Sequence, residues 1–297
     1  MPPEPETLRA LLAEAQAALA AGPHSQRARK DAETILLQVL TGSDPTRNRA
    51  WLLAHSDFLL TPEAAAEYRA LIQRRLAGEP VQYIAGEAEF YGLSFHVTRH
   101  VLIPRPETEH LVEKAIALAG GFSAPRILDI GTGSGAIAVA LAVHLPHASI
   151  TATDLSSSAL AIAQSNARRN GVDSRIRFLA GDLLAPVSGE QFEIIVSNPP
   201  YVSAADRASL DVEVREYEPP PALFAGDDGL AIYRRLIPQA VAALVPGGFL
   251  ALEIGHGQQD DIRSLLAASG FHAIEFIPDL QGIPRVAAAQ RPGRALL

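Results

Sequence analysis

The sequence of 297 residues contains no cysteine. This absence excludes disulfide bonds, thiolate nucleophiles and cysteine-ligated metal sites. No segment approaches the roughly 18 consecutive apolar residues of a membrane-spanning helix, and the first residues lack the basic start and apolar core of a signal peptide. We therefore expect a cytoplasmic protein that does not associate with membranes.

An excess of positive charge is absent as well. The chain has 33 acidic and 25 basic residues and a formal net charge of −8. Because affinity for phosphate depends on Lys and Arg, this balance argues against direct binding of nucleic acid. The nine histidines show no metal-ligand spacing, so we expect no metal site. Hydrophobic residues make up 48% of the chain, enough for a sizeable core.

The first 80 residues have the pattern of helices. Apolar residues recur at helical spacing, and glycine, proline or a capping residue bounds each segment. The expected helices are Thr7–Ala20, Ser25–Leu40, Arg47–Ala54 and one that Thr61 and Pro62 open and that runs to Ala77. No strand pattern interrupts them. We predict a small helical bundle domain over residues 1–80.

Residues 81–106 have a different character. The aromatic and β-branched residues of Glu87–Val97 predict a β-hairpin. The segment Ile103–Glu107 is too rich in proline for a helix or a central strand. We predict that residues 81–106 form a linker built on this hairpin.

Strand and helix patterns alternate through the rest of the chain. The expected helices are Thr108–Ala119, Ala136–His144, Ser158–Asn170, Gly229–Leu244 and Asp260–Ser269. The expected strands are Arg126–Ile130, Ser149–Asp154, Ile176–Gly181, Glu193–Ser197, Phe249–Ile254, Phe271–Ile277 and Arg285–Ala289. The last two strands are too close in sequence for a crossover helix, so the last one is antiparallel. Residues 107–297 are thus predicted to form a Rossmann-like, doubly wound α/β domain with a seven-stranded sheet.

A glycine-rich loop follows the first of these strands. Its G-x-G-x-G spacing differs from the G-x-G-x-x-G of dinucleotide-binding loops. Asp129 lies two residues before the first glycine, where a carboxylate suits an ammonium group better than a pyrophosphate. The loop therefore favours S-adenosylmethionine over a nicotinamide dinucleotide. The loop residues that we expect to bind this cofactor are Gly131, Thr132, Gly133, Ser134 and Gly135.

Acidic residues also end the next two strands. Asp154 is placed where an acid can accept hydrogen bonds from both ribose hydroxyls of a nucleoside. After the third strand, we expect Asp182 to meet the adenine amino group and Leu183 to pack on the ring. A single acid at such a position is as readily a helix cap or a solvated charge. Three acids at successive strand ends beside the glycine loop favour cofactor binding, because ligands bind at the carboxyl ends of such strands.

The buried strand Glu193–Ser197 runs directly into Asn198-Pro199-Pro200-Tyr201. The two prolines fix φ and remove two backbone donors. The Asn198 oxygen and a nearby main-chain carbonyl can then accept both hydrogens of one NH2 group, while Tyr201 offers an aromatic face. Such acceptors raise the electron density on a weakly nucleophilic nitrogen, and the site aligns it with a methyl sulfonium. We assign catalysis to Asn198, Pro199 and Tyr201 and substrate binding to all four residues. The alternative is a proline loop that only ends a strand.

With these motifs, the sequence resembles the PrmC/HemK family of protein-(glutamine-N5) methyltransferases over nearly its whole length. Asn-Pro-Pro-Tyr also occurs in adenine-N6 DNA methyltransferases, and its combination with the segment Val101–Glu109 is much more specific to this family. The other segments that carry the resemblance are Glu79–Gly86, Phe90–Phe95, Asp129–Ile137, Tyr217–Pro219 with Ala222-Leu223, Asp228–Leu230 with Tyr233-Arg234, Glu253–Gly255, and Asp279–Gly282 with Arg285-Val286.

The resemblance implies a class I methyltransferase fold and the use of S-adenosyl-L-methionine, with S-adenosyl-L-homocysteine as product. The implied acceptor is the glutamine of the Gly-Gly-Gln motif in class 1 peptide chain release factors, whose methylation modulates translation termination. Asn198–Tyr201 would bind this glutamine, and Asn198 would also lie near the methyl donor. The helical domain would help to hold the release factor, and we expect a monomer. Leu183 departs from the aromatic residue that is common in relatives, which removes stacking on adenine but keeps apolar packing.

Other functions remain open at this point. An adenine methyltransferase acting on nucleic acid predicts a basic recognition region, but acidic residues offset the basic ones in the first 80 residues. A non-catalytic cofactor-binding module predicts a damaged Asn198 motif, which is intact. A nicotinamide-dependent dehydrogenase is the weakest of the three. Arg105, Glu107 and Glu109 have either a functional role or a role in capping and solvating the helix after Pro106, and we favour structural ordering of the cofactor lid.

Overall fold

The computed structural model describes residues 5–41, 44 and 46–293, which fall into two compact units. The helical unit comprises the residues up to Gly86 together with Asp211–Tyr217, and the sheet unit comprises Glu87–Leu210 and the residues from Glu218 onward. Residues 1–4, 42–43 and 45 of the expected helical domain, and 294–297 of the expected α/β domain, lie outside the described residues. Among the described helices, none is long and apolar enough to cross a membrane.

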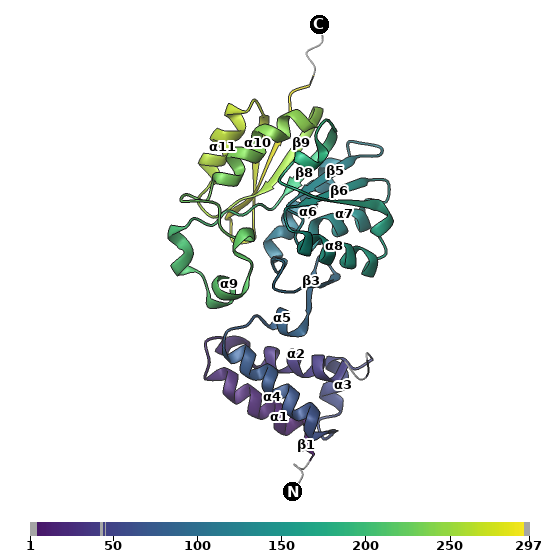
Figure 1. The fold of residues 1–297 in the computed structure, drawn as a ribbon, viewed down its shortest axis with the longest axis vertical. Coiled ribbons are helices and arrows are strands. Elements are labelled where there is room, and N and C mark those ends of the chain that lie inside the picture. The colour runs from purple at the N-terminus through teal and green to yellow at the C-terminus, as the bar shows by residue number, and fades with distance from the viewer. Residues whose placement is uncertain (1–4, 42–43, 45, 294–297) are drawn as a thin grey trace. The chain divides into compact units, whose positions relative to one another are not determined.

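The helical unit agrees with the predicted bundle (Figure 1). Side-chain oxygens of Thr7, Asn48 and Thr61 accept hydrogen bonds from backbone N–H groups in the first turns of three helices, as N-caps do. Leucine, isoleucine and alanine side chains from the main helices share one core. The helices are α1 Leu8–Ala20, α2 Ala28–Thr41, α3 Arg49–Ala54, α4 Pro62–Leu76 and α5 Val81–Ala85.

Two features of this unit differ from the sequence predictions. Glu6–Thr7 (β1) pairs antiparallel with Leu59–Leu60 (β2), so the expectation that no strand occurs here was wrong. Two residues per strand are too few to leave a periodic pattern. The second feature is α9, Val212–Tyr217, which the sequence placed within the α/β domain. It packs in the helical unit, where the Tyr217 hydroxyl donates to the Ala77 carbonyl over 3.0 Å.

The sheet unit contains seven strands in the order β10-β11-β9-β8-β5-β6-β7. The five strands from β5 to β9 are mutually parallel, and β11 is antiparallel to both of its neighbours. This arrangement confirms the predicted doubly wound sheet with an antiparallel last strand. The strands are β5 Arg126–Ile130, β6 Ser149–Asp154, β7 Ile176–Ala180, β8 Phe192–Ser197, β9 Leu244–Glu253, β10 His272–Pro278 and β11 Pro284–Gln290.

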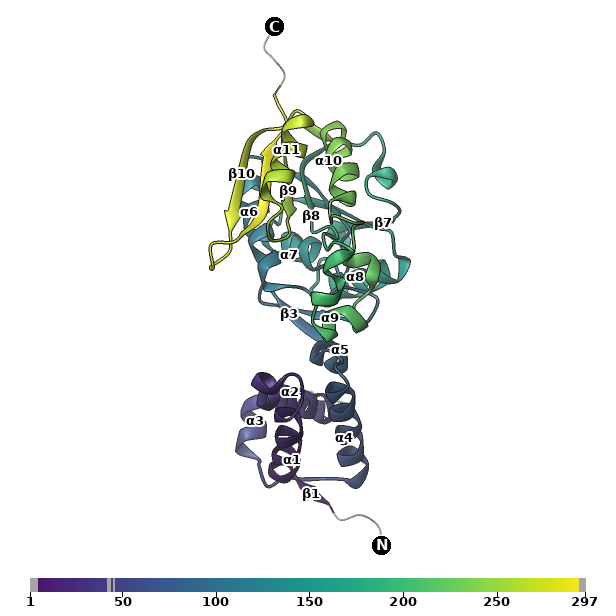
Figure 2. The ribbon, with the colours of Figure 1, turned by 90° about the vertical axis from the view of Figure 1, so that its left-hand side faces the viewer.

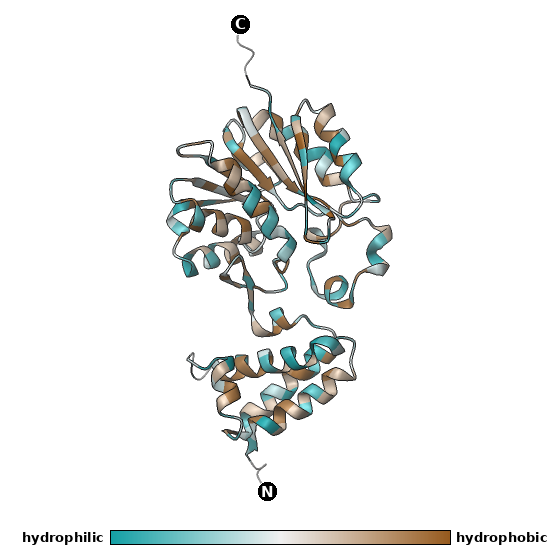
Figure 3. Cartoon of the chain, turned by 180° about the vertical axis from the view of Figure 1, so that it is seen from behind, coloured by the Kyte–Doolittle hydropathy of each residue, from teal (hydrophilic) through white to brown (hydrophobic). Residues whose placement is uncertain are grey.

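Helices cover both faces of this sheet. Helices α6, α7 and α8 lie on one face, and α10 and α11 lie on the other (Figures 1 and 2). The strands between them are predominantly hydrophobic, and the outer faces of the helices are more polar (Figure 3). A two-stranded hairpin, β3 Glu87–Phe90 and β4 Leu93–His96, contacts α8 as a separate sheet. The helices are α6 Glu109–Ala119, α7 Ala136–His144, α8 Ser157–Arg169, α10 Ala231–Ala243 and α11 Gln259–Ala268.

Candidate active site

The predicted site residues gather at one edge of the sheet, the one formed by the carboxyl ends of the parallel strands. The parallel register places Ile130, at the end of β5, beside Thr153 of β6 and Ser197 of β8. The loops that follow these strands therefore begin side by side. Because β7 and β9 run in the same direction, the residues after them reach this edge too. The edge lies where the strand order reverses, which is where ligands bind in such sheets.

The glycine loop after β5 needs its glycines for two reasons. Gly131, Gly133 and Gly135 all have positive φ, at 72°, 56° and 82°. A Cβ on Gly135 would lie 3.1 Å from the Cα of Ala163, so this glycine also lets α7 and α8 approach. A Cβ on Gly131 would meet nothing within 4 Å, so open space lies beside this part of the loop.

Asp129 is fully buried beneath this loop. Its Oδ2 accepts a hydrogen bond from the Thr132 hydroxyl over 2.7 Å, whereas its Oδ1 has no hydrogen-bond partner. Burial raises the pKa of Asp129 to about 7, with the nearby Asp154 carboxylate adding to the effect. An unpartnered buried carboxylate oxygen fits a positively charged ligand group, which would compensate its lost hydration.

Asp154 joins two loops of the site. Its Oδ2 accepts from the Gly133 N–H and its Oδ1 from the Ser156 N–H, each over 2.8 Å. Burial raises the pKa of this carboxyl. The next residue, Leu155, is 72% exposed, and sequence reasoning missed it. The available signal was an apolar residue directly after a strand-end acid.

The residues after β7 are arranged less as expected. Asp182 forms an ion pair with Arg235 of α10, and about half of each side chain is exposed. The expected contact with adenine requires this carboxylate to leave the ion pair or to share it. Leu183 has a positive φ of 49° and packs partly against the core. Its carbonyl accepts from the Thr153 hydroxyl over 3.2 Å, which fixes the loop to β6.

The Asn198–Tyr201 motif follows β8 and is anchored at its start. The Ser197 hydroxyl donates to the Ile130 carbonyl over 2.7 Å, which ties β8 to β5 beside the glycine loop. The Asn198 Nδ2 donates to the Thr108 hydroxyl over 3.1 Å. Among the described residues, no hydrogen-bond donor contacts the Asn198 Oδ1.

Tyr201 is held at both its hydroxyl and its backbone. The hydroxyl donates to Glu253 Oε1 over 3.4 Å, and burial raises the pKa of this phenol. The backbone carbonyl accepts from the Gln258 side chain over 3.1 Å. A Cβ on Gly229 would lie 2.3 Å from the same carbonyl, so this position requires glycine.

The residues Arg105 and Glu109 order the segment before α6. Arg105 donates two hydrogen bonds, of 2.8 and 2.6 Å, to the buried Glu218 carboxylate. Glu109 accepts from the Tyr91 N–H over 2.8 Å, which connects α6 to the turn of the hairpin. Both contacts fit the structural role expected from the sequence. Between these two residues, Thr108 lies 4% exposed beside Glu253, and sequence reasoning assigned neither residue to the site.

The strand order, the glycine loop and the strand-end acids define a class I S-adenosylmethionine-dependent methyltransferase. Residues 108–215 match the methyltransferase small domain, and residues 10–86 match the PrmC N-terminal domain. The fold is shared with the 16S rRNA methyltransferase RsmC of T. thermophilus, solved with AdoMet and guanosine. The TM-score is 0.52 at 20% identity, over 69% of this chain and 49% of that one.

Two curated relatives specify the family. The chain is 44% identical over 286 residues to the release factor glutamine methyltransferase of Moorella thermoacetica, covering 96% of this chain and 99% of that protein. It is 45% identical over 261 residues to the protein of the same name from Geobacter sulfurreducens, covering 88% and 89%. The chain therefore belongs to the release factor glutamine methyltransferase family, and its cofactor is S-adenosylmethionine.

Proposed function

We propose that this chain transfers the methyl group of S-adenosylmethionine to the side-chain nitrogen N5 of the glutamine in the Gly-Gly-Gln motif of class 1 release factors. The observation that carries this proposal is the orientation of Asn198 at the end of β8. Its NH2 group is used by Thr108, so its oxygen is left to accept a hydrogen bond from an incoming amide. Membership of the family supports the same acceptor.

The cofactor would lie along the glycine loop. The unpartnered Asp129 oxygen would receive the ammonium group of the methionine part, and Gly131–Gly135 would follow its backbone. Asp154 would accept the ribose hydroxyls, because an ionised carboxylate keeps acceptor positions beyond the two already used. Around adenine, Leu155 and Leu183 would pack on the ring and Asp182 would meet the amino group.

The acceptor amide would lie against Asn198–Tyr201. The Asn198 Oδ1 and a main-chain carbonyl of the Pro199-Pro200 segment would accept both amide hydrogens, and the Tyr201 ring would hold the amide plane. When bound, S-adenosylmethionine would supply the methyl group to this nitrogen, and its sulfonium would become the neutral thioether of S-adenosyl-L-homocysteine. The nitrogen then loses one proton to solvent. The protein contributes alignment and hydrogen-bond acceptors, which act most strongly on the cationic nitrogen.

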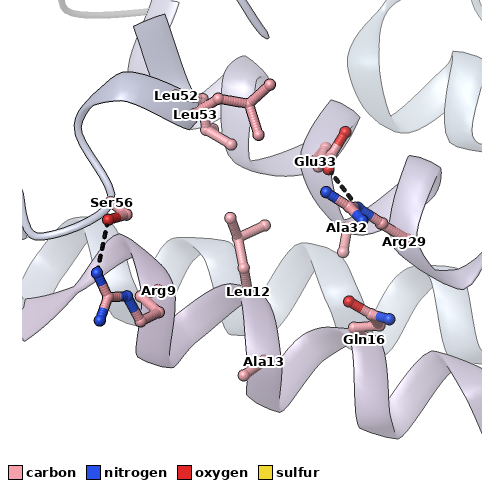
Figure 4. A pocket seen from close by; sticks show the side chains of 10 residues that line it. All are labelled: Arg9, Leu12, Ala13, Gln16, Arg29, Ala32, Glu33, Leu52, Leu53 and Ser56. Atoms are coloured by element: carbon pink, nitrogen blue, oxygen red, sulfur yellow. Dashed lines mark hydrogen bonds and ion pairs between the residues drawn. The ribbon is translucent and has the colours of Figure 1, made fainter. Parts of the chain in front are cut away.

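We further propose that residues 1–80 form the domain that recognises the release factor, 81–106 a linker and 107–297 the methyltransferase domain. A groove of about 220 Å³ on the helical unit supports the first role (Figure 4). Leu12, Leu52 and Leu53 form its apolar part, and Arg9, bonded to Ser56, and Arg29, bonded to Glu33, lie at its two ends. The enzyme would act as a cytoplasmic monomer, without direct contact to nucleic acid or membrane.

Mass spectrometry of a class 1 release factor, after incubation with the full chain and S-adenosylmethionine, tests the reaction. The expected result is one added methyl group on the Gly-Gly-Gln glutamine and none on other glutamines. If calorimetry detects cofactor binding but the glutamine stays unmodified, the substrate assignment is wrong. Other protein glutamines and adenine-containing nucleic acid would then be tested as acceptors under the same conditions.

A further inference from the structure

A chain of hydrogen bonds connects the acceptor motif to two buried residues outside it. The Asn198 Nδ2 donates to the Thr108 Oγ1 over 3.1 Å, and the Thr108 hydroxyl donates to Glu253 Oε2 over 2.5 Å. The Tyr201 hydroxyl lies 3.4 Å from the other oxygen of Glu253. Thr108 is 4% exposed and Glu253 is 2% exposed, so the bond between them is buried, and the bonds to Asn198 and Tyr201 are partly buried.

The number of protons available in this series of hydrogen bonds determines which way the Asn198 amide faces. A hydroxyl has one proton, and an ionised carboxylate can only accept. The Thr108 proton is therefore committed to Glu253, and the Thr108 oxygen can only accept from Asn198. Asn198 must turn its NH2 group towards Thr108, which directs its oxygen away. A flipped amide would bring two acceptor oxygens together inside the protein, which costs a buried hydrogen bond.

We propose that Thr108 and Glu253 are positioning residues that hold the Asn198 side-chain oxygen towards the acceptor nitrogen. Neither residue is placed on the substrate or the cofactor, and both act through Asn198. The inference rests on the proposed role of Asn198 in binding the acceptor amide. If the amide flipped, its NH2 group would face the NH2 group of the substrate, and the acceptor that activates the nitrogen would be lost.

The hydrogen-bonded chain from Glu253 through Thr108 to Asn198, which we call the relay, depends on the charge of Glu253. A protonated Glu253 can donate to Thr108, which frees the Thr108 proton for the Asn198 oxygen and removes the preference for one amide orientation. The groups that face Glu253 are the Thr108 and Tyr201 hydroxyls, the Glu107 carboxylate and the Arg285 guanidinium, and Tyr233 donates to its backbone carbonyl. Burial outweighs these donors and the cation, and the pKa of Glu253 is raised to about 7.

A double-mutant cycle tests the relay in the full-length enzyme with its release factor. Thr108→Val keeps the shape of the side chain and removes the hydroxyl. It is expected to lower kcat about 10- to 100-fold, as is found for residues that orient metal-ligating side chains, with the KM for S-adenosylmethionine unchanged. Thr108→Ser restores the hydroxyl and should restore kcat. In an Asn198→Ala background, Thr108→Val should cause no further loss, because residues that act as a unit are not additive.

Several results would overturn the inference. Additive losses in the cycle, wild-type kcat in Thr108→Val, or failure of Thr108→Ser to restore kcat would each show that the contacts only anchor α6 to β9. If Thr108→Val does not fold, Glu253→Gln gives a second test. At saturating cofactor, the wild-type kcat should decrease as the pH is lowered below about 7. The Glu253→Gln variant carries a neutral amide, so its pH profile of kcat should lack this acidic limb. An unchanged limb contradicts the role of Glu253.

A spectroscopic readout separates this inference from the proposed substrate. The chain has four asparagines, Asn48, Asn166, Asn170 and Asn198, so selective 15N-asparagine labelling gives few side-chain NH2 signals. The signal that Asn198→Ala removes should shift in Thr108→Val and should titrate with Glu253 in the absence of any acceptor. A signal unaffected by both changes contradicts the relay, whereas a wild-type enzyme that fails to methylate glutamine contradicts only the proposed function.

Discussion

Gly133 donates its backbone N–H to the Asp154 carboxylate over 2.8 Å, so the end of β6 holds the glycine loop that follows β5. The other oxygen of Asp154 accepts from Ser156, at the start of α8. One side chain thus organises two loops of the cofactor site before a ligand binds. Such preorganisation lowers the ordering cost of binding.

Replacing Asp154 should therefore affect the cofactor twice, through the loop and through the proposed ribose contact. Asp154→Ala is expected to raise the Kd for S-adenosylmethionine about 10- to 100-fold, since hydrogen bonds to a charged group contribute about 1.5–3 kcal/mol. Asp154→Asn keeps one acceptor and should lose less. Isothermal titration calorimetry measures both. Asp173→Ala is the matched control, because Asp173 lies directly before β7, at the amino-terminal ends of the parallel strands and away from the site. An equal loss there would remove the specific role of Asp154.

The buried Asp129 predicts a pH dependence of cofactor binding. Its pKa is raised to about 7, and the ammonium group of the ligand favours the ionised form. Binding should therefore strengthen as pH rises through this value, roughly five- to tenfold between pH 6 and 7.5, and release protons. Above about pH 8 an α-amino group loses its own charge, so the gain should end there. Calorimetry in buffers of different ionisation enthalpy measures both quantities.

Asp129→Asn provides the control for this prediction. The amide is neutral at every pH in the range, so the affinity of the variant should be lower at pH 7.5 and nearly independent of pH. If the variant kept the wild-type pH dependence, another group would be responsible. Asp154 would be the next residue to test, because burial raises its pKa as well.

Gly135 should tolerate no side chain, and Gly171 is the matched control for this prediction. Both residues have positive φ, 82° and 69°, which costs an alanine about 1–2 kcal/mol. A Cβ on Gly171 meets nothing within 4 Å, whereas one on Gly135 lies 3.1 Å from both Cα and Cβ of Ala163. Gly135→Ala should therefore lower the melting temperature more than Gly171→Ala, as followed by circular dichroism. Equal losses would mean that α8 moves aside at little cost.

Local patterns in the sequence were sufficient for most of the sheet unit. The alternation of strands and helices predicted the order of elements, and the short last connection predicted the antiparallel strand. The glycine spacing and the strand-end position of Asn198 pointed to the edge where these residues meet. Each of these signals lies within a few neighbouring residues.

The rest depends on contacts between distant positions. Thr108 and Glu253 are 145 residues apart, and only the folded sheet brings them together beneath Asn198. Asp182 was predicted from its strand-end position, but the sequence does not reveal its Arg235 partner on α10. The membership of α9 in the helical unit likewise depends on contacts with residues more than 130 positions away in the sequence, such as the Ala77 carbonyl.

The groove of the helical unit predicts an effect on the protein substrate alone. Leu53 lines this groove and is 56% exposed, so Leu53→Glu should leave folding and cofactor binding intact. It should raise the KM for the release factor about tenfold, typical for a polar residue in an apolar contact, without changing kcat. Leu59→Glu, 54% exposed but outside this groove, is the control. A short Gly-Gly-Gln peptide should be methylated equally by all three proteins, and any difference there would place Leu53 elsewhere in the mechanism.

Arg75 is the strongest candidate for a stabilising residue of the helical unit. Its side chain is fully buried between Asp31 of α2 and Glu213 of α9, at 2.7 and 2.5 Å. Arg75→Met leaves the Asp31 carboxylate without its cation and leaves Glu213 only its contacts with His24 and Arg27, which should cost about 3–5 kcal/mol. Arg75→Lys keeps the charge but loses the planar fork, so its loss should be smaller. Hydrogen exchange should show lost protection in α2 and α4, with β5–β9 unchanged. Uniform loss over both units would instead mean that they unfold together.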